Sequence, residues 1–136
     1  MNIFYHGWVD KKTLADAWQS ADIWFYPCIF METFCLTALE AAMTKTLVIT
    51  NDLAALQNTV GDRGVVIKGD PMSLEWQQQA LTEIYKYINN SEEYAVEKQL
   101  LIDKNYIWAK SLTWENQAKK LITNYIKPIQ SYIKQD

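Results

Sequence analysis

Short apolar runs of strand length alternate with helix-forming stretches along the first half of this chain. The runs are Ile3–Tyr5, Ile23–Tyr26, Leu47–Thr50 and Gly64–Ile67. Their consecutive positions are apolar, as in central parallel strands that are covered by helices on both faces. Strands that alternate with helices in this way predict a doubly wound parallel sheet flanked by helices, in the α/β class.

The stretches between these runs carry helix signals. Asp10 is a predicted N-cap, and it precedes apolar residues at helical spacing: Leu14, Ala17, Trp18 and Ala21. A second helix is expected to end near Met43, and a short third one to span Leu53–Val60. Each of these helices therefore connects two successive strands of the expected sheet.

From Ser73 onward the pattern is helical. One helix is expected to present a single apolar face, made by Leu74, Leu81, Ile84, Tyr85 and Ile88. The polar residues 89–91 break it, and a second helix is expected from Glu92 to Trp108. We therefore predict one domain over 1–136, with an α/β sheet core in 1–72 and a helical C-terminal segment in 73–136.

A last helix is predicted to begin at Thr113 as N-cap. Its apolar stripe is expected to pack on this domain and comprises Trp114, Ala118, Leu121, Ile122 and Tyr125. Pro128 is expected to end or kink the helix. Beyond it, Ile129, Tyr132 and Ile133 continue the stripe and are expected to remain uncovered, which favours weak self-association through this tail.

Composition narrows the class of protein. Hydrophobic residues make up 49% of the chain and charged residues 21%, which indicates a soluble globular domain. A net charge of −3 argues against nucleic acid as the main partner. The two cysteines, Cys28 and Cys35, are too few for a disulfide scaffold, and no metal site is predicted. With no signal peptide and no apolar run of transmembrane length in the sequence, we expect a cytoplasmic protein.

Two glutamates, Glu32 and Glu40, lie on either side of the expected start of the second helix, in the segment ETFCLTALEAA. In parallel α/β sheets, ligands bind at the carboxyl ends of the strands, where helix N-termini offer free N–H groups to phosphate. A carboxylate is a poor phosphate ligand, but it accepts hydrogen bonds from two hydroxyl groups. The segment therefore favours a ligand that combines phosphate with the hydroxyl groups of a ribose or a sugar.

This E-x7-E segment, preceded by a strand that ends at Pro27, resembles the donor site of retaining GT-B glycosyltransferases, the glycosyl transferases of group 1. The upstream segments FYHGWV and ADI fit the same pattern, as does Trp114 with the helix that follows it. The resemblance implies a Rossmann-like domain, the C-terminal half of a GT-B architecture, without the N-terminal acceptor domain. It also implies a nucleoside-diphosphate sugar as donor, transfer with retention at the anomeric carbon, and no cofactor or obligatory metal.

The resemblance assigns roles to individual residues. Glu40 is expected to bind the ribose hydroxyls of the donor, and Glu32 to reach the hydroxyls of the transferred sugar, as the catalytic residue. The loop residue Thr33 belongs to the same donor-binding segment, and the backbone N–H groups of Phe34, Cys35, Leu36 and Thr37 are expected to hold the diphosphate. Gly7 is expected to line the pocket of the nucleotide base.

The sequence departs from the family pattern at two positions. Cys35 stands where the family usually has glycine, which bears on donor affinity or sugar choice. Lys45 replaces a glycine before the next strand, which bears on folding. A catalytic thiol at Cys35 is not predicted, because no His or Asp lies beside it in the sequence. His6, the single histidine, is predicted to be a packing or surface residue.

The family's phosphate-binding Arg and Lys belong to a strand–helix unit that is not in this sequence. We therefore expect the chain alone to bind donor without completing sugar transfer. Two other hypotheses remain open at this point. One is a non-catalytic module that binds a nucleotide sugar or a protein partner, which the substitutions at Cys35 and Lys45 favour. The other is a fragment of a nucleotide-sugar epimerase on the same architecture.

Overall fold

A small parallel sheet lies at the centre of the computed structural model, which describes residues 3–89 and 92–133, with side chains as far as residue 130. Its strands are β1 (Ile23–Tyr26), β2 (Leu47–Asn51) and β3 (Val65–Ile67), in the order β1-β2-β3. Ile23 is in register with Leu47, and Ile49 with Val65. The predicted α/β class and parallel sheet are confirmed.

Both faces of the sheet are covered, and β2 is buried at all five positions. Val48 belongs to a core cluster with residues of α2 (Leu36–Met43) and α3 (Leu56–Thr59). Its neighbours Leu47 and Ile49 belong to a second cluster, made with residues of α4 (Leu74–Ile88) and α5 (Glu92–Ser111). Since successive side chains of a strand point to opposite faces, the two clusters lie on opposite sides of the sheet, as predicted.

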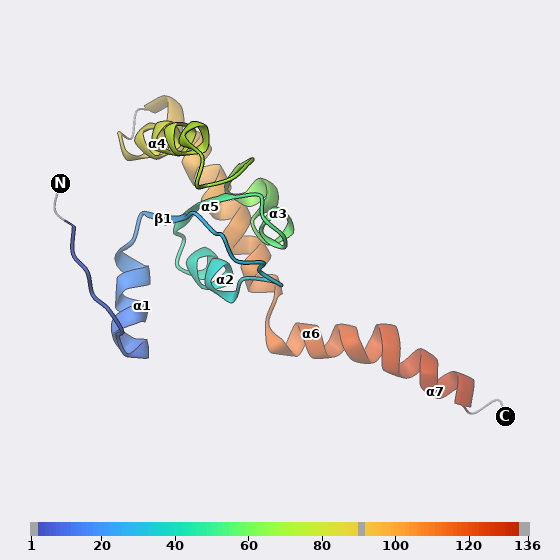
Figure 1. The fold of residues 1–136 in the computed structure, drawn as a ribbon. Helices are drawn as coiled ribbons and strands as arrows, with labels where there is room; N and C mark the ends of the chain where they lie inside the picture. The colour runs from blue at the N-terminus through green and yellow to red at the C-terminus, as the bar shows by residue number, and fades with distance from the viewer. Residues whose placement is uncertain (1–2, 90–91, 134–136) are drawn as a thin grey trace.

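Helix α1 (Lys11–Ser20) begins where the sequence predicts. The Oδ1 atom of Asp10 accepts a hydrogen bond from the backbone N–H of Thr13 at 2.7 Å, which caps the first turn. No residue of α1 is buried, although Trp18 packs in part against the cluster around Val48. The helix therefore lies at the margin of the domain (Figure 1).

The predicted strand at Ile3–Tyr5 is wrong. These residues have no regular secondary structure, and their side chains are 92%, 74% and 96% exposed. A strand requires a hydrogen-bonded neighbour, and within the described ranges the sheet contains only β1, β2 and β3. An apolar run of this length is therefore not sufficient to form a strand by itself.

The short helix predicted at Leu53–Val60 is only partly confirmed. Ala54 has a positive φ of 52°, which a regular helix does not accept, so α3 begins two residues later. A 3-10 turn, η1 (Gly61–Arg63), then leads into β3. The connection between β2 and β3 is thus a short helix followed by a tight turn.

Helix α4 turns a different face toward the sheet than the periodicity predicts. Leu81 and Tyr85 of the expected stripe are 55% and 61% exposed, whereas Trp76, Ala80 and Tyr87 are buried. The indole N–H of Trp76 donates to the carbonyl oxygen of Ile67 at 3.1 Å. This bond fixes the rotation of α4 relative to β3, and the helix is apolar enough on both sides to allow it.

Helix α5 runs to Ser111, three residues past its predicted end, and it packs against α2 and α4. A polar cluster joins it to α4: Glu97 accepts from the hydroxyl of Tyr87 at 3.0 Å and pairs with Lys86 at 2.9 Å. The hydrogen bond from Lys86 lowers the pKa of Glu97. No helix in the described parts of the chain combines the length and apolarity needed to cross a membrane.

The C-terminal helices form a rod that projects from the domain (Figure 1). They are α6 (Trp114–Leu121), a π-helical stretch η2 (Ile122–Ile126) and α7 (Lys127–Ile133). Thr113 caps α6 as predicted, through a bond from the Asn116 N–H at 3.2 Å. Pro128 does not end the helix, because the wider π turn before it makes room for the proline ring.

The predicted packing of the tail is wrong in its first half. Trp114 is 89% exposed, Leu121 54% and Tyr125 63%, so the stripe of α6 and η2 does not bury itself on this domain. Ile122 is exposed as well. Ile129 is exposed, as predicted, whereas the side chains of Tyr132 and Ile133 lie outside the described residues.

Candidate functional site

The loop that connects β1 to α2, residues 28–35, carries most of the predicted site, and we name it the acidic loop. Its first residue is tied to the end of β2 by two hydrogen bonds. The backbone N–H of Cys28 donates to Oδ1 of Asn51 at 2.8 Å, and Nδ2 of Asn51 donates to the carbonyl oxygen of Cys28 at 2.9 Å. Both residues are buried, so the loop begins from a fixed point at the carboxyl edge of the sheet.

Glu32 is half-buried and is held through its side chain and its backbone. The hydroxyl of Tyr26 donates to its Oε1 atom at 3.0 Å. Its backbone N–H donates to the carbonyl of Phe30 at 2.9 Å, and its own carbonyl accepts from the N–H of Ala55 at 3.2 Å. The carboxylate is therefore positioned by the last residue of β1 as well as by the loop.

Tyr26 is itself fixed by aromatic packing. Its ring stacks on Trp24, with centroids 4.7 Å apart and planes at 16°, and Trp24 meets Trp18 of α1 edge-on at 5.5 Å. A hydrogen bond with the Cys28 side chain, then burial and the bond to Glu32, raise the pKa of Tyr26 well above its usual value. The phenol is thus protonated at neutral pH and donates its proton to the carboxylate.

Cys35 immediately precedes α2 and has the backbone conformation that the family's glycine would favour. Its φ of 67° and ψ of 78° are left-handed, a region that side chains other than that of glycine rarely occupy. The thiol is buried and makes no capping bond. Burial raises the pKa of this thiol, which keeps it neutral and argues against a nucleophilic role.

The first turn of α2 offers backbone donors beside Glu32. Leu36 and Thr37 are its first two residues, and their side chains are exposed. Such N–H groups have no partner inside a helix, and the side chain of Cys35 does not cap them. Thr33 is exposed in the loop just before this turn. This arrangement is suited to an anion that lies across the start of the helix.

The end of the acidic loop packs against Trp108 of α5, whose ring also contacts the side chain of Arg63. Phe34 lies 6.2 Å from the ring of Trp108 in α5, measured between centroids. The guanidinium of Arg63 lies over the same Trp108 ring, 4.3 Å from its centroid. The end of the loop therefore rests on α5 through one aromatic ring, and that ring rests on the turn η1.

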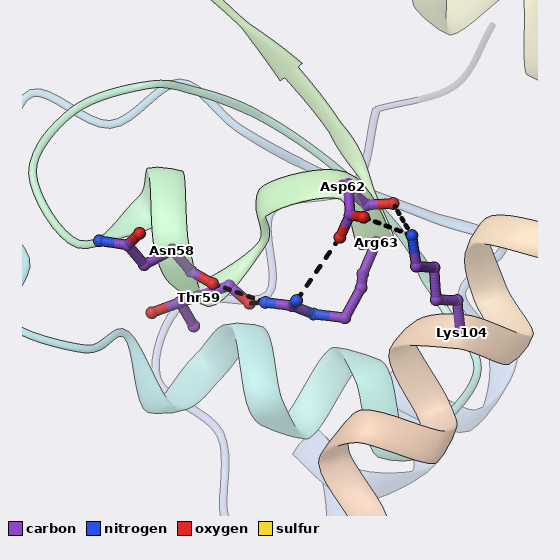
Figure 2. Close-up of polar contacts among 5 residues, drawn as sticks. All are labelled: Asn58, Thr59, Asp62, Arg63 and Lys104. Atoms are coloured by element: carbon purple, nitrogen blue, oxygen red, sulfur yellow. Dashed lines mark hydrogen bonds and ion pairs between the residues drawn. The ribbon is translucent and has the colours of Figure 1, made fainter.

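Arg63 and its neighbours form a polar network around η1 (Figure 2). The Nη2 atom of Arg63 donates to the carbonyl oxygens of Asn58 at 2.5 Å and Thr59 at 3.0 Å, so it closes the end of α3. Asp62 pairs with Arg63 at 3.6 Å and also with Lys104 of α5, and the hydrogen bond from Lys104 lowers the pKa of Asp62. The network has a supporting role: it holds η1 against α5.

Glu40 is exposed one helical turn after Leu36. Within the described residues, its carboxylate forms no hydrogen bond or ion pair. It lies at a groove of about 560 Å³ between α1 and α2, lined among others by Lys11, Leu14, Trp18 and Met43. Glu40 is thus available to an external ligand, as its predicted role requires.

Gly7 lies in the exposed segment before α1 and has a positive φ of 61°. No hydrogen bond in the described parts of the chain joins it to the acidic loop. The N-terminal segment runs along α1, at a distance from α2 (Figure 1). The structure therefore groups Glu32, Thr33, Phe34, Cys35, Leu36, Thr37 and Glu40, and it leaves Gly7 apart. The role of Gly7 remains a prediction.

Several supporting residues were missed in the sequence: Tyr26, Asn51, Arg63 and Trp108. Only Tyr26 carried a usable signal, because it is a polar-tipped aromatic at the last position of a strand, six residues before Glu32. Asn51 contacts Cys28, and Arg63 contacts Trp108, and in both pairs the two residues are far apart in the sequence. Short-range spacing gives no indication of such contacts.

Comparison with known proteins now adds to this geometry. The model of the family described as glycosyl transferases group 1 matches residues 1–83, a range that includes the sheet, the acidic loop and α2. The chain belongs to this family. Residues of the chain are also 36% identical over 61 positions to a Klebsiella pneumoniae protein described as an uncharacterized 41.2 kDa protein in the cps region. That match covers 45% of this chain and 17% of the Klebsiella protein, so only a small part of that relative is represented.

Proposed function

We propose that this chain is the donor-binding half of a glycosyltransferase of the hexosyltransferase type. It would bind a nucleoside-diphosphate sugar, whose sugar is transferred to an acceptor with retention of the anomeric configuration. Family membership supports sugar transfer as the activity. The observation that carries the donor role is the half-buried Glu32, oriented by Tyr26 and placed just before the open N-terminus of α2.

The proposed pose places the diphosphate at the first turn of α2, where the N–H groups of Leu36 and Thr37 point outward from the helix. Glu32 then accepts hydrogen bonds from the transferred sugar. Glu40 lies about 6 Å further along the helix, given a rise of about 1.5 Å per residue, and accepts from the ribose. The two acids are thus separated by the phosphates, which matches the order of groups in a nucleotide sugar.

Charge accumulates on the departing diphosphate in the transition state of glycosyl transfer. In the proposed mechanism, the N–H groups of α2 stabilise part of this charge through short, oriented hydrogen bonds. The remaining stabilisation requires cations, which we propose come from residues outside this chain, together with the acceptor-side N-terminal domain. We accordingly propose that the chain by itself binds nucleotide weakly, does not turn over, and requires neither metal nor cofactor.

Titration of the chain with UDP and GDP, followed by amide NMR, tests the proposal. We expect shifts concentrated in residues 32–40, with Gly7 included if it lines the base pocket. Glu40→Gln should weaken binding of the bare nucleotide by about 1–3 kcal/mol, because a charged hydrogen bond to ribose is lost. Glu32→Gln should leave the affinity for the bare nucleotide nearly unchanged.

Glu75→Gln is the matched control, because Glu75 is an exposed acid in the first turn of α4, on another part of the molecule. It should change neither the affinity nor the pattern of shifts. Shifts confined to surfaces other than α2 and the acidic loop would refute the donor site. Equal losses in the Glu32 and Glu40 variants would show that the two roles are wrongly assigned.

A further inference from the structure

We infer that Tyr26 is a positioning residue of the donor site, whose hydroxyl orients the carboxylate of Glu32 toward the transferred sugar. This inference rests on the proposed function and adds to it a residue outside the E-x7-E segment. Its starting point is the hydrogen bond of 3.0 Å from the Tyr26 hydroxyl to Oε1 of Glu32. The bond links the last residue of β1 to the acidic loop directly.

The bond holds one oxygen of the Glu32 carboxylate in place. Oε1 accepts from Tyr26, and the Cys35 thiol also forms a side-chain hydrogen bond with this carboxylate. A glutamate side chain has several rotatable bonds and is usually mobile when it has no partner. With one oxygen held by Tyr26, the carboxylate has a defined direction, and its remaining lone pairs are available to a sugar hydroxyl.

Tyr26 is rigid enough to act as this support. Its ring lies on Trp24, which contacts Trp18, and its carbonyl oxygen accepts from the hydroxyl of Thr50 in β2 at 2.7 Å. The ring therefore cannot swing away without disturbing both β1 and α1. Packing requires only the aromatic ring, and the hydroxyl, which also bonds to the Cys28 side chain, is the group to which we assign the orientation of Glu32.

The expected effect of the hydroxyl is selective. Bare nucleotide contacts α2 and Glu40 in the proposed pose, and so its binding does not depend on Tyr26. Sugar nucleotide also contacts Glu32, and its additional affinity depends on where that carboxylate points. A tyrosine that served only the fold would influence both ligands alike, because it would act through overall stability.

The variant Tyr26→Phe tests this, with Tyr87→Phe as its matched control. The control removes the same atom from the same kind of bond, because the hydroxyl of Tyr87 donates to Oε1 of Glu97 at 3.0 Å between α4 and α5. Calorimetric titration of the full chain with UDP, UDP-glucose, GDP and GDP-mannose gives the Kd of each ligand. The quantity compared is the ratio of Kd for the nucleotide to Kd for its sugar derivative.

We expect Tyr26→Phe to lower this ratio about fivefold for the sugar nucleotide that the wild type prefers, as for the loss of one hydrogen bond to a charged group. The Kd for bare nucleotide should change less than about twofold. Tyr87→Phe should leave the ratio unchanged. Because Tyr26 acts through Glu32, the double variant Tyr26→Phe/Glu32→Gln should discriminate no worse than Glu32→Gln alone.

A measurement without ligand completes the test. In Tyr26→Phe, amide hydrogen exchange in residues 30–35 should become faster, and the carboxyl ¹³C resonance of Glu32 should shift, with neither change in Tyr87→Phe. An unchanged ratio, or an equal change in both variants, would overturn the positioning role and leave the proposed function intact. If the wild type binds none of the four ligands, the proposed function fails, and the role of Tyr26 in it fails as well.

Discussion

Strand β2 and the C-terminal rod of α6, η2 and α7 are both rich in apolar residues, but only β2 is buried. Every position of β2 is covered, because it has a strand on each side and helices on each face. The apolar stripe of the rod stays in solvent from Trp114 to Ile129. An apolar pattern therefore indicates that a segment needs a partner, and the topology of the chain decides whether one is present.

The same substitution in the two regions should have very different effects. Leu56→Ala removes a side chain that is 0% exposed in the core cluster, and it should lower the free energy of unfolding by about 2–5 kcal/mol. Leu121→Ala, at a position 54% exposed in the rod, should change it by less than about 0.5 kcal/mol. Chemical denaturation of both variants measures the two values, and a large loss at Leu121 would show that the rod belongs to the core.

A smaller effect is expected at the turn between α2 and β2. Lys45 has a φ of 60°, so it carries left-handed strain that glycine would relieve. Lys45→Gly and Lys45→Ala both lose the contact between the ammonium and the Tyr106 ring, 5.0 Å away. Since alanine retains the strain, the glycine variant should be more stable by about 1 kcal/mol. Equal thermal denaturation of the two would mean that the turn adopts another conformation in solution.

The smallest effect on stability is expected for deletion of residues 128–136. Residues 128–130, the part of this segment whose side chains are described, are exposed, so the free energy of unfolding should change by less than about 0.5 kcal/mol. Sedimentation velocity of the full chain and the deletion variant should show weak self-association in the first and a monomer in the second. Unfolding of the shortened chain would place the tail within the core and refute its role as a docking segment.

Local signals predicted most of the fold. Asp10 and Thr113 cap their helices where the sequence places them, because a cap depends on residues three positions apart. Strands β1, β2 and β3 were predicted within one residue, from continuous apolar runs. The strand at Ile3–Tyr5 and the buried face of α4 were not, because each depends on which distant element is available as a partner.

The candidate site likewise has features that local sequence predicts and features that depend on distant contacts. The acidic segment and its glutamates were readable in the sequence, and the two positions where glycine was expected, Cys35 and Lys45, both have positive φ. The backbone requirement was thus predictable even where the residue type differs. The supports of the site, among them Tyr26 and Asn51, depend on contacts that close only when the chain is folded.

The pair of hydrogen bonds between Asn51 and Cys28 has a consequence for which residues of this site can change. The side-chain amide of Asn51 pairs with the backbone of Cys28 through one donated and one accepted hydrogen bond, as a neighbouring strand would. The start of the acidic loop is therefore fixed without the side chains of the residues that follow. The fold consequently does not require the exposed side chains of Ile29, Phe30 and Met31. If the proposed donor site is correct, substitutions at these three positions should change which sugar is accepted while the domain keeps its architecture.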